Sequence, residues 1–228
     1  MEEEPEQSTS AAPEWAHNPA TGEISHVLVP PADGRGEVEL FLQPGAAVAA
    51  AHTHDSIIER FEVLEGDVTF LVGDLERPMG PGDGTAEVQV GVVHDWWNSG
   101  DGIARVRVEI EAVPSAPGDP AGRFVELIET LWSLAVLGEV NEQGLPDPLW
   151  LAAIAHEYRD VIRFVKPSAV IQSVMFPPLA AIGRRLGRDP RDPSLHGPGA
   201  PLWIDDPGDG LDELLARHVG AAAARERG

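Results

Sequence analysis

His52, His54 and Glu59 lie close together in the segment from Gly45 to Phe70. Residues two apart in a β-strand point to the same side of the sheet, so the two imidazoles are expected to share one face. A short turn would then return Glu59 on the neighbouring strand. Two imidazoles and one carboxylate are a donor set that suits Fe(II), Mn, Co, Ni or Zn and leaves coordination positions open for water, oxygen or substrate.

His94, in the later segment from Val88 to Gly100, offers a third imidazole. If its strand belongs to the same barrel, three histidines and one glutamate converge on one divalent metal ion in a cavity that excludes water, where electrostatic interactions are strong. The chain has no cysteine, which excludes disulfides, thiolate metal sites and cysteine nucleophiles. The metal ligands must therefore be nitrogen and oxygen atoms.

The elements that would carry these residues are short strands. Between Glu23 and Val113, runs rich in Val, Ile and Phe are separated by turn sequences such as those at 44–45, 65–67, 80–84 and 99–102, a pattern typical of a β-sandwich or barrel. The stretches Ile103–Ile110 and Val68–Val72 alternate between apolar and other residues, which predicts strands with one buried face.

The two histidine segments resemble the two motifs of the cupin superfamily. The first motif, HxH, three or four residues, Glu, six residues, Gly, is matched by His52, His54, Glu59 and Gly66. The second, PxGxxH, three residues, Asn, is matched by Gly91, His94 and Asn98. Two positions depart from the pattern: Gln89 stands where the second motif has Pro, and Gly45 lies one position further from the first His than usual. Neither is a ligand position, so the departures concern turn geometry.

The resemblance covers about residues 16–114 and is to small single-domain bacterial cupins. It implies a mainly β fold, the double-stranded β-helix or jelly-roll barrel, over residues 15–114, and a homodimer. Fe(II) is the favoured metal, with Mn, Ni, Co or Zn as alternatives. Glu59 is the candidate catalytic residue, since a carboxylate that detaches from the metal could act as a general base if burial raises its pKa.

The rest of the chain is read as a tail and a helical extension. Residues 1–14 are polar and acidic, which predicts a disordered tail. After a linker, residues 115–228 form an α-helical C-terminal extension. Its helices are expected after an Asp119 cap, from Asp147-Pro148 to about Phe164, from Ser168 to Leu186 with an interruption at Pro177-Pro178, and from Leu211 to Arg227. The third is expected to pack against the barrel or across a dimer, with an amphipathic surface binder as the alternative.

Charge and hydropathy restrict the partners. With 38 acidic and 16 basic residues the formal net charge is -22, which repels nucleic acid and anionic membranes. The start of the sequence has no hydrophobic signal stretch and no segment is long and apolar enough to span a bilayer, so a cytoplasmic protein is expected.

Strand parity also predicts which side chains line a substrate pocket. The candidates are Phe41, Phe61, Phe70, Trp96 and Val106. The equally plausible reading is that some of them merely fill the core of the barrel. Asn98 is expected to form a turn, and the remaining histidines are placed outside the site.

These residues lead to functional hypotheses of two classes. The first is a metal-dependent enzyme acting on a small organic substrate, phenolic or enolisable, by oxygenase chemistry resembling that of quercetinase or, alternatively, as an isomerase or cyclase. The second is a non-catalytic module that uses the barrel to bind a small molecule and the helices to bind a protein. A tightly bound metal with open positions favours the enzyme, and a filled, metal-free barrel favours the module.

Overall fold

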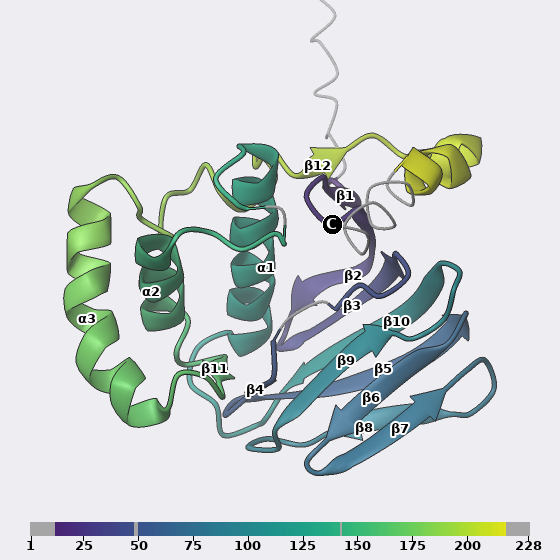
Figure 1. Cartoon of the computed structure of the whole chain (residues 1–228), viewed down its shortest axis with the longest axis horizontal. Coiled ribbons are helices and arrows are strands. Elements are labelled where there is room, and N and C mark those ends of the chain that lie inside the picture. The colour runs from purple at the N-terminus through teal and green to yellow at the C-terminus, as the bar shows by residue number, and fades with distance from the viewer. Residues whose placement is uncertain (1–11, 48–49, 142, 218–228) are drawn as a thin grey trace, which may run out of the picture.

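The computed structural model describes residues 12–47, 50–141 and 143–217. The fold is mostly β, with two antiparallel sheets and helices toward the C-terminus, as predicted (Figure 1). Of the tail expected over residues 1–14, only 12–14 are described, and they are irregular. Residues 211–217 are helical, and the remainder of the helix expected to Arg227 lies outside the described residues.

Each sheet combines strands from the predicted barrel with one short strand from the C-terminal part. Among the described residues, the larger sheet has the order β12 (Trp203–Ile204), β1 (Trp15–Asn18), β2 (Glu23–Ala32), β3 (Arg35–Leu42), β10 (Ala104–Ala112), β5 (Ile57–Glu65) and β8 (Thr85–Val88). The smaller has the order β11 (Arg163–Phe164), β4 (His52–Thr53), β9 (His94–Asn98), β6 (Val68–Val72) and β7 (Leu75–Met79).

The alternation of apolar residues decides which face of each strand is buried. In β10 the residues Val106, Val108 and Ile110 are buried, as predicted. The opposite face carries Arg105, whose guanidinium pairs with Glu39 at 2.6 Å. Strand β6 runs from Val68 to Val72, as predicted, and on the predicted face Val68 and Phe70 are buried while Val72 is partly buried.

Gly66 makes the turn between β5 and β6, and no other residue fits there. Its φ is +77°, and a Cβ atom would lie 2.8 Å from the carbonyl oxygen of Ile103 and 2.9 Å from the Cα of Ala104. A residue without a side chain is needed both for the left-handed conformation and for the close approach of the two backbones. The glycine of the first motif therefore has a structural role, because it lets the turn after β5 lie directly against the start of β10.

The first two helices begin where the sequence predicts. In α1 (Pro120–Val136) the side chain of Asp119 accepts a hydrogen bond from the backbone N–H of Gly122, and Pro120 takes the first position. In α2 (Pro148–Glu157) Asp147 caps the first turn in the same way. The expected extension of this helix to Phe164 is wrong, because the chain turns at Tyr158 and residues 163–164 form β11.

The third helix, α3 (Ala169–Arg185), runs through Pro177 and Pro178 without the expected interruption. Beyond the prolines the helix is held against α2: Ala180 and Gly183 are buried, and a Cβ on Gly183 would lie 3.1 Å from the carbonyl oxygen of Leu149. This contact compensates for the two missing backbone donors. The helix therefore packs on α2, not on the barrel, and it leaves an apolar face exposed. That face comprises Val170, Ile171, Val174, Met175 and Ile182.

One hydrophobic core joins the sheets to the helical extension. Phe61, Phe70 and Val106 from the strands belong to the same buried cluster as Leu127 and Trp132 from α1. Figure 1 shows α1 beside the strands, α2 next to it and α3 outermost. None of the helices in the described segments has the length and hydropathy that a membrane span requires.

Glu23, at the start of β2, is a buried carboxyl group whose protonation is coupled to folding. It is 3% exposed, and its Oε1 has no hydrogen-bond partner. Burial raises its pKa to about 7, although hydrogen bonds from Thr21 and Asn18 oppose the rise. Because the folded state then binds the proton more tightly than the unfolded state, this group makes the protein less stable as the pH rises from about 4.5 to 7.

We expect Glu23→Gln to be within about 1 kcal/mol of the wild type at pH 5 and to be more stable than it at pH 8, by an amount approaching ~3 kcal/mol. Urea denaturation at both pH values measures the difference, and Glu62→Gln, at an exposed position of β5, is the control. An equal stability difference at pH 5 and pH 8 would contradict the assignment.

Candidate metal centre

His52, His54, Glu59 and His94 converge at one point between the two sheets. Their ligand atoms all lie within 4.8 Å of one another, and all four residues are 1–4% exposed. His52 on β4 is directly opposite His94 on β9, while Glu59 comes from β5 in the larger sheet. This buried group could bind a metal ion. The pairing of β4 with β9 brings together residues that are 42 positions apart in the sequence.

Backbone carbonyls orient all three imidazole rings. The Nδ1 of His52 lies 2.8 Å from the oxygen of Ala50, and the Nδ1 of His94 lies 3.2 Å from that of Val92. The Nδ1 of His54 lies 2.7 Å from the oxygen of Val161. Since a carbonyl oxygen only accepts hydrogen bonds, each Nδ1 must carry the proton. In the neutral form of each ring the lone pair is then on Nε2, and this is the form that binds a metal ion.

The distances among these atoms fit a bound cation. The Nε2 atoms of His52 and His54 are 3.1 Å apart, and Glu59 Oε2 lies 3.0 Å from His54 Nε2 and 2.8 Å from His94 Nε2. If every Nδ1 is protonated, the Nε2 lone pairs of His52 and His54 face each other unless a proton or a metal ion lies between them. The donors are nitrogen and oxygen only, which suits the divalent metals Fe, Mn, Co, Ni and Zn.

The pKa values of the group are governed by burial and by mutual contact. Burial, together with His94 and His54, lowers the pKa of His52 to about 3, so this ring is neutral at physiological pH. Burial also disfavours protonation of His54, but the hydrogen bond and charge of Glu59 outweigh it and raise the pKa of His54.

The pKa of Glu59 is lowered, and the expected rise is wrong. Burial alone would raise it, but hydrogen bonds and positive charge from His54 and His94 outweigh burial. The expected rise followed from the apolar barrel alone, whereas two imidazoles contact the carboxylate. Glu59 is consequently ionised at neutral pH, which favours binding of a cation.

The C-terminal extension supplies a wall of the site that the sequence analysis missed. The ring of Phe124 on α1 packs edge-on against His54 at 5.1 Å between centroids, and Phe164 on β11 lies 6.4 Å from His52. The carbonyl oxygen that orients His54 belongs to Val161. A sequence signal was present, since the run from Val161 to Val165 is rich in β-branched residues and precedes Lys166-Pro167, as a short strand often does.

The predicted pocket residues are only partly brought together. Phe61, Phe70 and Trp96 form a cluster with centroid separations of 5.2–5.8 Å, at most 5% exposed. Val106 belongs to the same core, and Trp96 lies two residues from His94 on β9. Phe41 does not join them, because it packs in a separate cluster with Ile24 and Leu215. A packed aromatic core therefore adjoins the four candidate ligands.

Asn98 ends β9 and forms a turn, as predicted. Its side-chain amide donates to the carbonyl oxygens of Leu42 and Gly102, and its Oδ1 accepts from the N–H of Gly100. The asparagine of the second motif thus closes the loop that follows the His94 strand.

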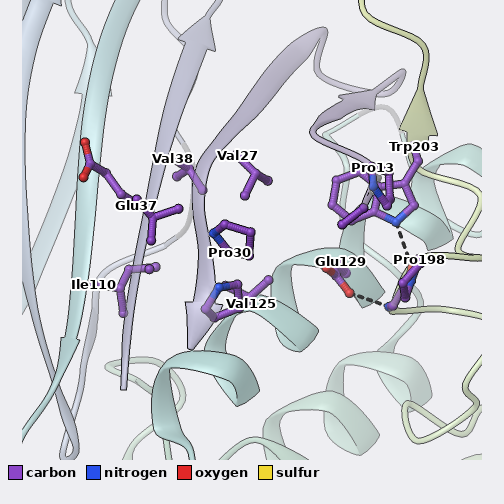
Figure 2. Close-up of a pocket in the computed structure, with 15 residues that line it drawn as sticks. Pro13, Val27, Pro30, Glu37, Val38, Ile110, Val125, Glu129, Pro198 and Trp203 are labelled. Carbon is purple, nitrogen blue, oxygen red and sulfur yellow. Dashed lines mark hydrogen bonds between the residues drawn. The ribbon is translucent and has the colours of Figure 1, made fainter. Parts of the chain in front are cut away.

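A separate apolar pocket of about 130 Å³ lies between the larger sheet and α1. Figure 2 shows Val27, Val38 and Ile110 on the side of the strands, with Val125 and Glu129 opposite them. The N–H of Gly197 donates to Glu129 at 2.6 Å. None of the four candidate ligands lines this pocket.

Comparison with known proteins finds a family match over part of the barrel. Residues 38–111 match a family model described as a cupin domain. Similar solved structures include a sugar phosphate isomerase of the cupin superfamily from Silicibacter pomeroyi, with 29% identity over 46% of this chain and 69% of that chain and a TM-score of 0.38. KdgF from Halomonas sp. is 14% identical over 44% and 88%, with a TM-score of 0.38. A variant oxalate decarboxylase from B. subtilis is 16% identical over 44% and 27%, with a TM-score of 0.37. No curated protein matches this chain.

Proposed function

We propose that this protein, whose residues 38–111 match the cupin domain model, is a metal-dependent enzyme acting on a small organic substrate. In this proposal His52, His54, Glu59 and His94 hold one divalent metal ion. The observation that carries the proposal is the convergence of three Nε2 atoms and one carboxylate oxygen on a single buried point. Each Nδ1 is already engaged by a backbone carbonyl, so the site is organised for binding before any ligand arrives.

Fe(II) is the metal we favour, with Mn, Co, Ni or Zn as alternatives, because the donor set contains imidazole and carboxylate but no thiolate. Such a metal ion supplies either activation of oxygen or Lewis-acid polarisation of a carbonyl or enol group. Oxygenase chemistry on a phenolic or enolisable substrate is our first choice of reaction, and isomerisation or cyclisation is the second.

The chain's own residues would position the reactants and exclude water. In this proposal Glu59 is a metal ligand that remains ionised, because its pKa is lowered. A carboxylate with a lowered pKa is a weak general base, so Glu59 could act as one only after it loses its contacts with His54 and His94. The aromatic cluster of Phe61, Phe70 and Trp96 would supply an apolar wall for a flat substrate. Entry to this buried point requires a local opening, and Phe124 and Phe164 are the rings that cover the histidines from the side of the extension.

A second candidate function is a non-catalytic module that binds a metal ion or a small molecule. The packing of Phe61, Phe70 and Trp96 against one another favours it, since a filled barrel leaves little room for a substrate. In either case we expect a homodimer from the cupin resemblance, and light scattering that gives only the monomer mass would contradict that expectation.

The deciding experiment is elemental analysis of protein purified without added metal, followed by oxygen uptake with a panel of phenolic and enolisable compounds. The same reactions are followed by NMR, which detects isomers or cyclised products formed without oxygen. We expect about one equivalent of a transition metal and turnover that a chelator abolishes and that the metal restores. Turnover that is unchanged after complete metal removal rejects the metal-dependent enzyme. Stoichiometric metal without turnover of any compound supports the module.

A further inference from the structure

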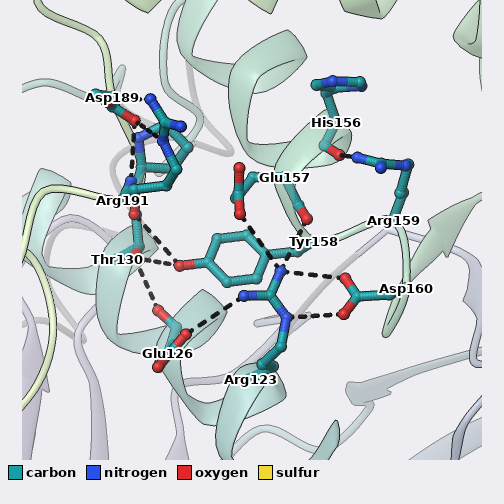
Figure 3. A network of polar contacts seen from close by, with 11 residues as sticks. Arg123, Glu126, Thr130, His156, Glu157, Tyr158, Arg159, Asp160, Asp189 and Arg191 are labelled. Atoms are coloured by element: carbon teal, nitrogen blue, oxygen red, sulfur yellow. Dashed lines mark hydrogen bonds and ion pairs between the residues drawn. The ribbon is translucent and has the colours of Figure 1, made fainter. Parts of the chain in front are cut away.

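A polar cleft lies on the helical side of the molecule, where the start of α1, the end of α2 and the end of α3 come together. It has a volume of about 460 Å³. It is lined by Arg123, His156, Glu157, Arg159, Asp160, Arg184 and Arg191. Figure 3 shows Arg123, Tyr158 and Asp160 in the middle of this network, with His156 and Arg159 on one side and Arg191 on the other. Four arginines lining one cleft are unexpected in a chain whose net charge is -22.

The positive charge is concentrated in this part of the sequence. Residues 159–191 contain seven of the 16 basic residues of the chain but only two of its 38 acidic residues. The rest of the protein is therefore even more acidic than the overall composition indicates. A local excess of positive charge next to a low-dielectric wall attracts small anions.

Two of the four arginines are paired with protein carboxylates. Arg123 pairs with Asp160 at 2.7 Å and packs over the ring of Tyr158 at 5.1 Å. Arg191 pairs with Asp189 at 2.8 Å. These contacts orient the two side chains as walls of the cleft, and part of their positive charge is already balanced.

The other two arginines have no such partner. Within the described segments, neither Arg159 nor Arg184 forms an ion pair, and Arg159 donates one hydrogen bond, to the carbonyl oxygen of His156. His156 lies within the field of both: burial and the charges of Arg159 and Arg184 lower its pKa, while Glu157 opposes them. The two carboxylates that line the cleft, Glu157 and Asp160, both pair with Arg123. Among the described residues, neither forms an ion pair with Arg159, Arg184 or His156.

We propose that this cleft binds the phosphate group of a small molecule, with Arg159, Arg184 and His156 as its donors. Arginine presents several N–H groups in a planar fork that matches phosphate oxygens, and hydrogen bonds between charged groups are the strong ones. The volume is that of a small-molecule site. A nucleic acid is disfavoured, because the acidic remainder of the surface would repel a long polyanion. The proposal does not depend on the metal centre, since none of these residues is a candidate ligand.

The test is a titration of the full chain with inorganic phosphate at constant ionic strength. Calorimetry measures the binding, and the NMR signals of His156 report on its protonation. Constant ionic strength is needed because salt screens exposed charges. We expect saturable binding, and a rise in the pKa of His156 when phosphate is bound. Arg184→Gln should weaken binding roughly tenfold or more, which is the effect of losing one charged hydrogen bond.

Arg185→Gln is the matched control, because Arg185 is the next residue of α3, is exposed and does not line the cleft. It should bind phosphate within about twofold of the wild type, as expected for a surface charge that makes no contact with the ligand. Arg159→Gln is a second test variant, at an exposed position where folding is not at risk. Absence of saturable binding in the wild type, unchanged binding in both test variants, or an equal loss in the Arg185→Gln control would overturn the proposal.

Discussion

Replacing His94 or His52 with alanine is expected to remove most of the bound metal while the barrel remains folded. Either substitution removes one of three imidazole donors and leaves Glu59 in a site with fewer donors. The loss of an outer hydrogen bond typically costs 10–100-fold in metal affinity, so loss of a ligand should exceed about 100-fold. Chelator competition measures the affinity, elemental analysis measures the stoichiometry, and circular dichroism measures the fold.

The control for these substitutions is His196→Ala, because His196 lies in the loop after α3 and outside the group of candidate ligands. It should retain the metal content of the wild type. Unaltered stoichiometry in both ligand variants would reject the site. A variant that loses both metal and secondary structure would be informative only together with the other variant, which is why two positions on different strands are chosen.

The convergence of the four candidate ligands could be anticipated because strand geometry is regular. The two-residue period places His52 and His54 on one side, and the motif spacing places Glu59 on the strand that follows. The carbonyl of Val161 could not be anticipated in this way. Any residue has a carbonyl group, so an outer hydrogen bond between positions 107 residues apart has no signature in residue types.

Strand alternation also explains why Phe41 was wrongly expected in the pocket. The end of β3 is buried on both faces, since Leu40 and Leu42 pack in the main core while Phe41 packs against Ile24 and Leu215. Where every residue of a strand is apolar, alternation no longer indicates which face meets the barrel interior. The end of α2 was missed for a related reason: Tyr158, Val161 and Ile162 are buried and continue the apolar pattern although the chain has left the helix.

Removal of residues 115–228 is expected to prevent the barrel from folding into a stable, metal-binding form. The deletion strips Phe124, Leu127 and Trp132 from the core that they share with the strands. Each large apolar side chain contributes about 1.5–3 kcal/mol on burial, and a whole domain is stable by only about 5–15 kcal/mol. The deletion also removes β11 and β12, which pair with β4 and β1. Without them, each of these two strands has an unpaired edge.

Thermal unfolding of residues 1–114 and of the full chain, each with and without added metal, measures this effect. We expect one cooperative transition for the full chain and none for the fragment. Phe164→Ala serves as the milder comparison, because it removes one partly buried ring that lies beside His52 at the margin of the core. We expect this variant to fold and to bind metal more weakly.

A fragment that melts at the temperature of the full chain and binds metal with equal affinity would show that the barrel is independent of the helices. The contacts of His54 with Val161 and Phe124 would then have no energetic consequence, whereas a shared core predicts that folding and metal binding are lost together.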